Sequence, residues 1–334
     1  RGGGGETLWL TTDWSPPHPV ALTEPPVMYI GADSLALVQH ALRPSPPVAS
    51  VLDLCCGSGI QGLAAARLYA SHATLVDLSP RAVRFSRFNA ALNSLADRVT
   101  VLQGDLYSAL HDTEAFQVIT ANPPFVPCPP DLNRKADRYA LFADGGASGE
   151  EILQGIVQGL PRHLVPGGRL SLVSELCNPD NFPSKVNSWL EKSIPGSLDR
   201  IEEPSSGPAG VGESQRPPEW DCAVVCDGAG HTYSRAAYAS IRAGCPGEVE
   251  GWSGHLAQMG IDEVARGFLF LHRSPGVDRA ADTTRDSPGA GRDPGRDPGQ
   301  DSGRDSGRDS GHDSGQQDVV TSRRADVRVC RADG

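Results

Sequence analysis

Short apolar segments alternate with helical segments through the middle of this 334-residue chain. The apolar segments cover residues 48–54, 73–78, 99–103, 116–121, 169–176 and 265–272. Segments with helical character lie between them, at residues 60–69, 79–95, 148–163 and 184–191. Short apolar runs bounded by turn residues are typical of buried parallel strands. This alternation predicts a doubly wound α/β fold, with a parallel sheet, helices on both faces and right-handed crossovers.

Several turn residues support these boundaries. Ser79 and Pro80 supply an N-cap and a first-turn proline for the helix that follows the second apolar segment. Glu150 and Glu151 place negative charge in the first turn of the helix at 148–163, where the helix dipole favours it. The Pro-Gly-Gly at residues 166–168 predicts a stop before the fifth strand.

Composition divides the chain into three regions. Residues 1–47 form a Pro-rich N-terminal lead with one helical stretch at 33–42, and residues 48–273 form the α/β domain. Residues 204–250 are rich in Gly and Pro, and we interpret them as an insertion before the last helix and strand. Residues 274–334 consist largely of Gly-Arg-Asp-Pro and Gly-Arg-Asp-Ser repeats, whose low hydrophobicity predicts a disordered tail.

Charge and cysteine content limit the possible partners. The net charge is -11, which disfavours strong non-specific binding to nucleic acids, because such binding needs many Lys and Arg contacts to phosphates. No apolar run is long enough to cross a membrane, so we expect no membrane partner. The eight cysteines include no C-x-x-C pair, so we expect no metal site and a reducing, intracellular location, with the cytoplasm favoured. The chain starts without Met, which leaves organelle targeting open, and its sequence does not predict an oligomeric state.

The first candidate binding motif directly follows the first predicted strand. Asp53 ends the strand, and Cys55, Gly57 and Gly59 follow it, so that backbone amides can approach a ligand closely. Together with Gly62, the two glycines also satisfy the G-x-G-x-x-G pattern of dinucleotide-binding loops. A tight strand-to-helix turn without a ligand is the alternative interpretation.

Two further motifs lie at the ends of the second and third predicted strands. Asp77, followed by Leu78, can accept hydrogen bonds from both hydroxyls of a ribose. Asp105 can accept a hydrogen bond from an adenine amino group, and Leu106 can pack on the ring. In open α/β sheets, ligands bind at the carboxyl ends of the strands, so we expect these residues to converge on one nucleoside.

The fourth motif ends the fourth predicted strand and is Asn122-Pro123-Pro124-Phe125. Two consecutive prolines cannot continue a central strand, and they fix the backbone with free carbonyl groups. The Asn122 side-chain oxygen and the Pro123 carbonyl would then form a pair of acceptors for a substrate NH2 group. Phe125 offers a flat face for a planar amide or base. This motif predicts chemistry at a planar nitrogen.

Taken together, the segments V-L-D-L-C-C-G-S-G, V-D-L-S-P, G-D-L-Y and N-P-P-F resemble those of class I S-adenosylmethionine-dependent methyltransferases. More narrowly, they resemble the methyltransferase small group, which includes the HemK-type glutamine methyltransferases and the ribosomal-RNA guanine methyltransferases. The Asp-Gly-Gly at 144–146 is similar to a segment of the glutamine enzymes, and residues 29–34 resemble the segment that lies over the cofactor. Phe125 stands where the commoner residue is Tyr, and no helical recognition domain is apparent ahead of the core.

This resemblance implies a Rossmann-like, seven-stranded, mostly parallel sheet whose last strand, at 265–272, is antiparallel. It implies S-adenosyl-L-methionine as the cofactor and methyl transfer as the reaction. The cofactor-binding residues that it implies are Asp53, Cys55, Gly57, Gly59, Asp77, Leu78, Asp105, Leu106 and Asn122. The catalytic residues that it implies are Asn122, Pro123, Pro124 and Phe125.

Several alternatives stay open on the sequence. The favoured acceptor is a protein glutamine, and an RNA or DNA base is the main alternative. A NAD-dependent dehydrogenase shares the glycine loop and Asp77, but it does not explain the Asn-Pro-Pro-Phe motif. A non-catalytic methyltransferase-like scaffold, with the repetitive tail recruiting partners, is the interpretation from another class.

Overall fold

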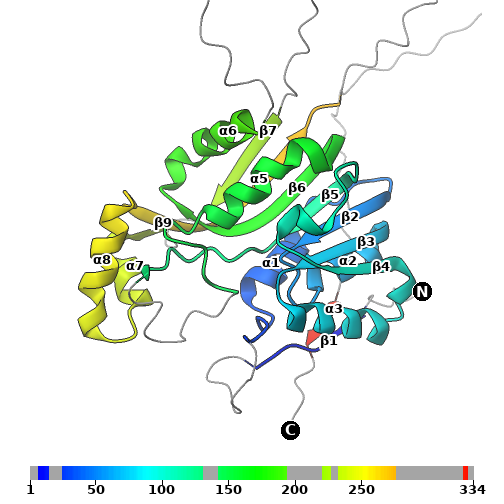
Figure 1. Cartoon of the computed structure of the whole chain (residues 1–334), viewed down its shortest axis with the longest axis horizontal. Coiled ribbons are helices and arrows are strands. Elements are labelled where there is room, and N and C mark those ends of the chain that lie inside the picture. Colours follow the sequence, from blue (N-terminus) through cyan, green and yellow to red (C-terminus); the bar gives the residue numbers. More distant parts are fainter. Residues whose placement is uncertain are drawn as a thin grey trace, which may run out of the picture. The chain divides into compact units, whose positions relative to one another are not determined.

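A mostly parallel sheet with helices on both faces forms the centre of the protein (Figure 1). The computed structural model describes residues 7–14, 25–130, 142–193, 220–226, 232–275 and 326–329. In chain order, the strands of the main sheet are β2 (Val48–Leu54), β3 (Ala70–Asp77), β4 (Val99–Gln103), β5 (Phe116–Ala121), β6 (Leu164–Cys177), β7 (Trp220–Cys226), β8 (Thr232–Ser234) and β9 (Glu263–Arg273). Their order across the sheet is β4-β3-β2-β5-β6-β9-β7, and β8 pairs with β9 outside this path.

The last strand, β9, lies between β6 and β7 and is antiparallel to both. The neighbouring pairs from β4 to β6 are all parallel. The predicted Rossmann-like fold is therefore confirmed, with seven strands in one continuous path and an antiparallel last strand. The short strand β8 is an addition that the sequence did not indicate.

Two helical layers cover the sheet. The helices are α1 (Ala32–His40), α2 (Ile60–Leu68), α3 (Pro80–Leu92), α5 (Glu151–His163), α6 (Phe182–Lys192), α7 (Arg235–Arg242) and α8 (Val249–Gln258). Apolar side chains of α1, α2 and α3 share one buried cluster, and those of α5 and α6 share another. The two groups of helices lie on opposite faces of the sheet (Figure 1). Helices α7 and α8 pack together beside the start of β9.

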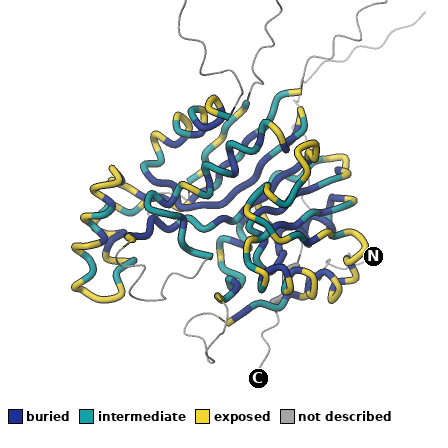
Figure 2. Tube along the Cα trace, viewed as in Figure 1, coloured by how far each residue is buried: buried dark blue, intermediate teal, exposed yellow. Residues whose placement is uncertain are grey.

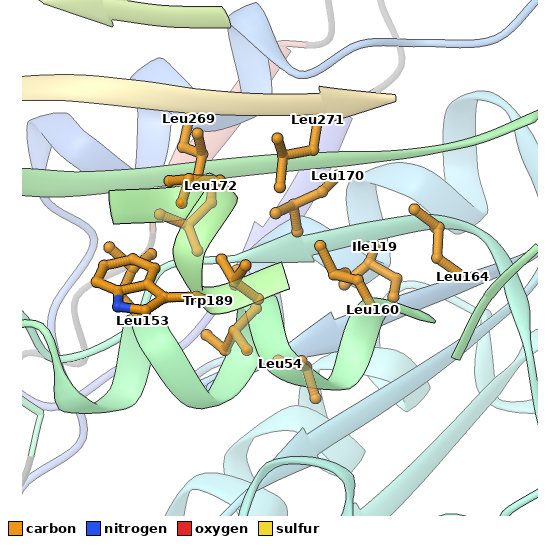
Figure 3. Close-up of a cluster of buried hydrophobic side chains, with 14 of the residues drawn as sticks. Leu54, Ile119, Leu153, Leu160, Leu164, Leu170, Leu172, Trp189, Leu269 and Leu271 are labelled. Carbon is orange, nitrogen blue, oxygen red and sulfur yellow. The ribbon is translucent and has the colours of Figure 1, made fainter. Parts of the chain in front are cut away.

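The largest buried cluster lies between the central strands and the helices α5 and α6. Figure 2 shows buried backbone along the middle strands and exposed residues on the outer sides of the helices. Figure 3 shows side chains from four strands meeting those of the two helices, among them Leu54, Ile119, Leu153, Leu160, Leu170, Leu172, Trp189, Leu269 and Leu271. This apolar packing fixes the strands and thus the positions of the loops at their carboxyl ends.

The predicted strands at 48–54, 99–103 and 116–121 have the bounds that the structure gives them. The predicted end of the helix at His163 is confirmed, but the strand that follows begins at Leu164 and not at Arg169, and it continues through residues 166–168 to Cys177. Gly167 has a φ of +78°, and the pairing with β5 shifts register there, so the glycines form an irregularity within the strand.

The interpretation of residues 204–250 as an insertion is also wrong for the part that the structure describes. Residues 220–226 form β7, an edge strand of the main sheet, and 232–242 hold β8 and α7. Alternating exposure along β7 explains why no continuous apolar run marks it, since one of its sides is half-buried and the other is exposed. Residues 204–219 and 227–231 lie outside the described residues.

The N-terminal lead packs against the α/β domain. Strand β1 (Thr7–Leu10) buries Leu8 and Leu10 in the cluster of α2 and α3. The Asp13 carboxylate pairs with Arg81 of α3 at 2.5 Å and accepts a hydrogen bond from the Val27 amide. Strand β10 (Asp326–Val329) pairs in parallel with β1. The remainder of the predicted tail beyond residue 275 lies outside the described residues, so its disorder stays a prediction.

Candidate functional site

The carboxyl ends of β2, β3, β4 and β5 lie side by side at one edge of the sheet. Leu54 pairs with Val76 on one side and with Ala121 on the other, and Asp77 pairs with Gln103. The chain order of the strands reverses between β2 and β5, and such a reversal leaves a crevice beyond the strand ends. All four candidate motifs follow directly from these strand ends.

A cavity occupies this crevice, and we call it the first cavity. Eight of the proposed site residues line it, namely Cys55, Gly57, Asp77, Leu78, Asp105, Leu106, Asn122 and Pro124. Residues 26–30 of the lead also line it, and the Asp13–Val27 hydrogen bond ties this segment in place. The lead therefore completes a wall of the cavity, which the sequence suggested only through a loose resemblance at 29–34.

The glycine loop after β2 has a backbone that only small residues permit. Gly57 and Gly59 have φ values of +54° and +85°, and a side chain at Gly59 would meet Leu75 at 2.9 Å. Helix α3 holds the loop from outside, because the Ser86 hydroxyl donates to the Gly57 carbonyl and the Asn89 amide donates to the Ser58 carbonyl. Gly59 supports the turn and does not line the cavity.

Asp53 also lies beneath the loop and does not line the cavity. It is fully buried, and its carboxylate accepts hydrogen bonds from the Gly62 amide at 2.8 Å and the Thr120 hydroxyl at 3.3 Å. It thus joins the start of α2 to β5. The expectation that Asp53 contacts the cofactor directly is wrong, because its side chain lies beneath the loop and holds the loop in position.

Burial raises the pKa of the Asp53 carboxyl to about 7, because the charged form loses its hydration. Between about pH 4 and pH 7 the folded chain then holds a proton that the unfolded chain has released. We expect Asp53 to make stability fall as pH rises through this window, by up to about 1.4 kcal/mol per pH unit. Asp53→Asn should remove this contribution, because its amide can accept from Gly62 and donate to Thr120. Urea unfolding across the window measures the slope, and an unchanged slope in Asp53→Asn would contradict the prediction.

Asp77 presents a half-buried carboxylate to the cavity. One oxygen accepts a hydrogen bond from the Gly57 amide and the other from the Ser79 amide, both at 2.8 Å. Burial raises the pKa of Asp77, and these two amide bonds act in the opposite direction. Since each carboxylate oxygen can accept more than one hydrogen bond, both stay able to receive ligand hydroxyls.

The described lining of the first cavity is acidic. It holds the carboxylates of Asp77, Asp105 and Asp144, and none of the described lining residues is Lys, Arg or His. A ligand with positive charge suits such a lining, whereas the diphosphate of a dinucleotide would meet repulsion. Leu78, Leu106 and other apolar side chains of the lining can pack against the flat faces of a nucleoside base.

Helix α1 fixes the orientation of the Asn122 side chain. The Asn122 Nδ2 donates to Asp33 Oδ2 at 3.2 Å and to Ser34 Oγ at 3.1 Å. A carboxylate only accepts hydrogen bonds, so the amide nitrogen must face Asp33. The Oδ1 atom of Asn122 therefore points away from this contact, with no hydrogen-bond partner among the described residues.

A second cavity begins on the other side of this contact. Met28 and Tyr29 line both cavities, whereas Asp33 and Phe125 line only the second. Asn122 and its partner Asp33 thus stand at the boundary between the two. Pro123 is buried and lines neither cavity, so only its backbone carbonyl is available for the predicted role.

The Asp-Gly-Gly segment supports the motif after β5. The Val126 amide donates to the Ala143 carbonyl, and the Gly145 amide donates back to the Val126 carbonyl. A side chain at Gly145 would lie 2.7 Å from the Phe125 Cα, and one at Gly149 would lie 2.6 Å from the Phe125 carbonyl oxygen. These glycines let the segment pack directly on the backbone of Phe125, a role that no local sequence signal specified.

Comparison with known proteins bears on this arrangement. Residues 31–130 match the family model described as methyltransferase small domain, which spans α1 and all four motif loops. This part of the chain is similar to the methyltransferase small domain. Among the described residues, no group of three or more His, Cys, Asp or Glu side chains could hold a metal ion, and no helix is long and apolar enough to cross a membrane.

Curated proteins with similar sequences include glutamine methyltransferases. A release factor glutamine methyltransferase of Geobacter sulfurreducens is 35% identical over 154 residues, which cover 44% of this chain and 52% of the relative. A ribosomal protein uL3 glutamine methyltransferase of Bradyrhizobium diazoefficiens is 35% identical over 178 residues, with 49% and 52% covered. The chain thus spans about half the length of the curated relatives it matches.

A solved structure of the 16S rRNA N2 G1207 methyltransferase from T. thermophilus, in complex with AdoMet and guanosine, is also similar. It is 25% identical with a TM-score of 0.35, and the match covers 50% of this chain and 39% of that one.

Proposed function

We propose that this protein transfers a methyl group from S-adenosylmethionine to a planar nitrogen, with a protein glutamine side chain as the acceptor. The observation that supports this proposal best is the position of the Asn122 amide at the boundary of the two cavities. Its Nδ2 is bound to α1, so its Oδ1 is left to accept a hydrogen bond from the substrate. The names of the relatives, which are glutamine methyltransferases of a release factor and of ribosomal protein uL3, support the choice of acceptor.

The first cavity fits S-adenosylmethionine by the chemistry of its lining. Asp77 would accept hydrogen bonds from the ribose hydroxyls, and Asp105 with Leu106 would hold the adenine. Residues 55–58 would line the methionine part, and the acidic lining suits the positive charges of the sulfonium and amino groups. When bound, the cofactor supplies a methyl group on a positively charged sulfur, which needs no metal for activation.

The protein's own groups would then orient the acceptor. Asn122 Oδ1 and the Pro123 carbonyl would accept the two N–H groups of the carboxamide, which draws the nitrogen lone pair out of conjugation. Phe125 would pack on the flat face of the amide. Orientation of this kind can lower a barrier by roughly 7–11 kcal/mol.

A transfer assay tests the proposal. Purified protein, S-adenosylmethionine with a labelled methyl group, and a bacterial lysate are incubated, and label is measured separately in protein, RNA, DNA and small molecules. We expect label in protein, with mass spectrometry locating the methyl group on glutamine. Label in RNA or DNA would favour a base as the acceptor, and label in no fraction would favour a non-catalytic scaffold.

Calorimetry tests which of the two cofactors the protein binds. We expect S-adenosylhomocysteine to bind and NADH to give no measurable heat, because the described lining of the first cavity carries three carboxylates and no cationic side chain. Tight binding of NADH would instead favour a dehydrogenase.

Asp33 is a positioning residue for Asn122, and its removal should lower turnover. Asp33→Ala loses the 3.2 Å hydrogen bond to Asn122 Nδ2, which is worth about 1–1.5 kcal/mol, so kcat should fall about tenfold. Asp33→Asn should rescue most of this loss, because its carbonyl oxygen still accepts from Asn122. Steady-state methylation kinetics measure the effect, and equal kcat values for the two variants would contradict the positioning role.

A further inference from the structure

The second cavity lies on the face of the sheet that α1 partly covers. It extends from Phe125 and Asp33 over β6 and β9 to Val225 of edge strand β7. It shares Met28 and Tyr29 with the first cavity, so the two cavities lie next to each other, with Asn122 in the lining of the first. An acceptor that enters from this side would meet Phe125 and Asp33 on its way to Asn122 in the first cavity.

Two aromatic rings form an apolar floor in this cavity. Phe268 and Phe270 alternate along β9 with Leu269 and Leu271, which are fully buried in the cluster on the opposite face of the sheet. The two phenylalanine rings lie 5.8 Å apart between centroids, at an interplanar angle of 13°. Both are half-buried, and the His40 ring packs edge-on against Phe268, so only the part of the two rings that is still exposed is available to an apolar side chain.

A cationic group stands beside this floor. The buried Glu175 carboxylate pairs with Arg242 at 2.5 Å and accepts a hydrogen bond from the Tyr238 hydroxyl at 2.5 Å. Arg266 Nε lies 3.8 Å from the other Glu175 oxygen, beyond hydrogen-bond distance, and its side chain is 59% exposed. Since Arg242 already meets the charge of Glu175, Arg266 presents positive charge at the cavity in a chain of net charge -11.

We propose that the second cavity is a docking groove for an extended polypeptide, in which Phe268 and Phe270 hold an apolar side chain and Arg266 pairs with an acidic side chain near the methylated residue. This inference rests on the proposed function. A polynucleotide fits the groove poorly, because its binding depends on many cationic contacts and the groove also exposes the carboxylate of Asp33 to phosphates.

A peptide library tests the groove. Synthetic peptides with a central glutamine and varied flanking residues are incubated with the full chain and S-adenosylmethionine, and mass spectrometry counts methylated products. We expect the wild type to favour peptides that carry both an acidic and an apolar flanking residue, with a KM about tenfold lower than for peptides with neutral polar flanks. Arg266→Ala should lose the acidic preference, and Arg266→Lys should keep it.

Matched control variants distinguish the loss of the Arg266 charge from other effects on methylation. Arg162→Ala removes another exposed arginine, on α5 at the opposite face, and should leave the preference unchanged. Phe270→Ala should raise KM for peptides with apolar flanks and leave the acidic preference intact. Methylation of glutamine peptides without flank preference, or a preference that survives in Arg266→Ala, would overturn the groove and leave the proposed function standing. Label that enters only RNA, in an Asn122-dependent manner, would overturn the glutamine proposal itself.

Discussion

Replacement of Asn122 by alanine should lower kcat by about 10²–10³-fold and leave the affinity for S-adenosylhomocysteine within about threefold of wild type. Removal of one preorganised hydrogen-bonding group from a reacting centre typically has a cost of this size. The large effect on kcat follows from the place of Asn122 in the lining of the first cavity, where Nδ2 is bound to Asp33 and Ser34 and Oδ1 is left to accept. Single-turnover methylation and calorimetry measure the two quantities.

An exchange of the two partners provides a sharper version of this test. Asn122→Asp should be nearly inactive, because its carboxylate would face the carboxylate of Asp33. In the double variant Asp33→Asn/Asn122→Asp, the amide introduced at position 33 can donate to the carboxylate introduced at position 122 and restore the orientation of the second oxygen. We expect the kcat of the double variant to be at least about tenfold higher than that of Asn122→Asp alone. If Asn122→Ala retained wild-type turnover, or if the exchange recovered nothing, the orientation by Asp33 would have no part in the reaction.

The parts of the site that the sequence predicted are those determined locally. Asp77, Asp105 and Asn122 each follow an apolar strand within a few residues, and the carboxyl ends of neighbouring parallel strands necessarily lie at one edge of the sheet. Strand identity was therefore sufficient to bring the four motifs together. The same logic predicted the antiparallel β9 only through a family resemblance, because an apolar run does not reveal strand direction.

The parts that the sequence missed depend on contacts between distant segments. The sequence predicts Asp53 to be a ligand-binding residue. In the structure it is buried beneath the loop and accepts hydrogen bonds from Gly62 and Thr120 instead. The sequence does not predict β7, because this edge strand alternates between half-buried and exposed residues and follows a segment rich in Gly and Pro. The pairing of Arg266 with Glu175 spans β9 and β6, and no pattern within either strand indicates it.

Replacement of Glu175 by alanine should destabilise the fold by about 1.5–3 kcal/mol, because the half-buried Arg242 guanidinium loses a charge-assisted hydrogen bond to a buried carboxylate. The Tyr238 hydroxyl, which is buried in the cluster of α7 and α8, would lose its acceptor as well. Burial raises the pKa of the Tyr238 hydroxyl, and the Glu175 carboxylate raises it further. Burial acts to lower the pKa of Arg242, but Tyr238 and Glu175 together raise it. Urea unfolding at fixed pH measures the loss of stability.

Two comparisons separate the charge pair from ordinary packing. Asp112→Ala breaks the exposed ion pair with Arg162 and should change stability by less than about 1 kcal/mol, because solvent screens that pair. The double variant Glu175→Leu/Arg242→Met removes both charges and fills their space, so it should be more stable than Glu175→Ala. If Glu175→Ala unfolded within about 1 kcal/mol of wild type, the pair would not hold α7 against β6.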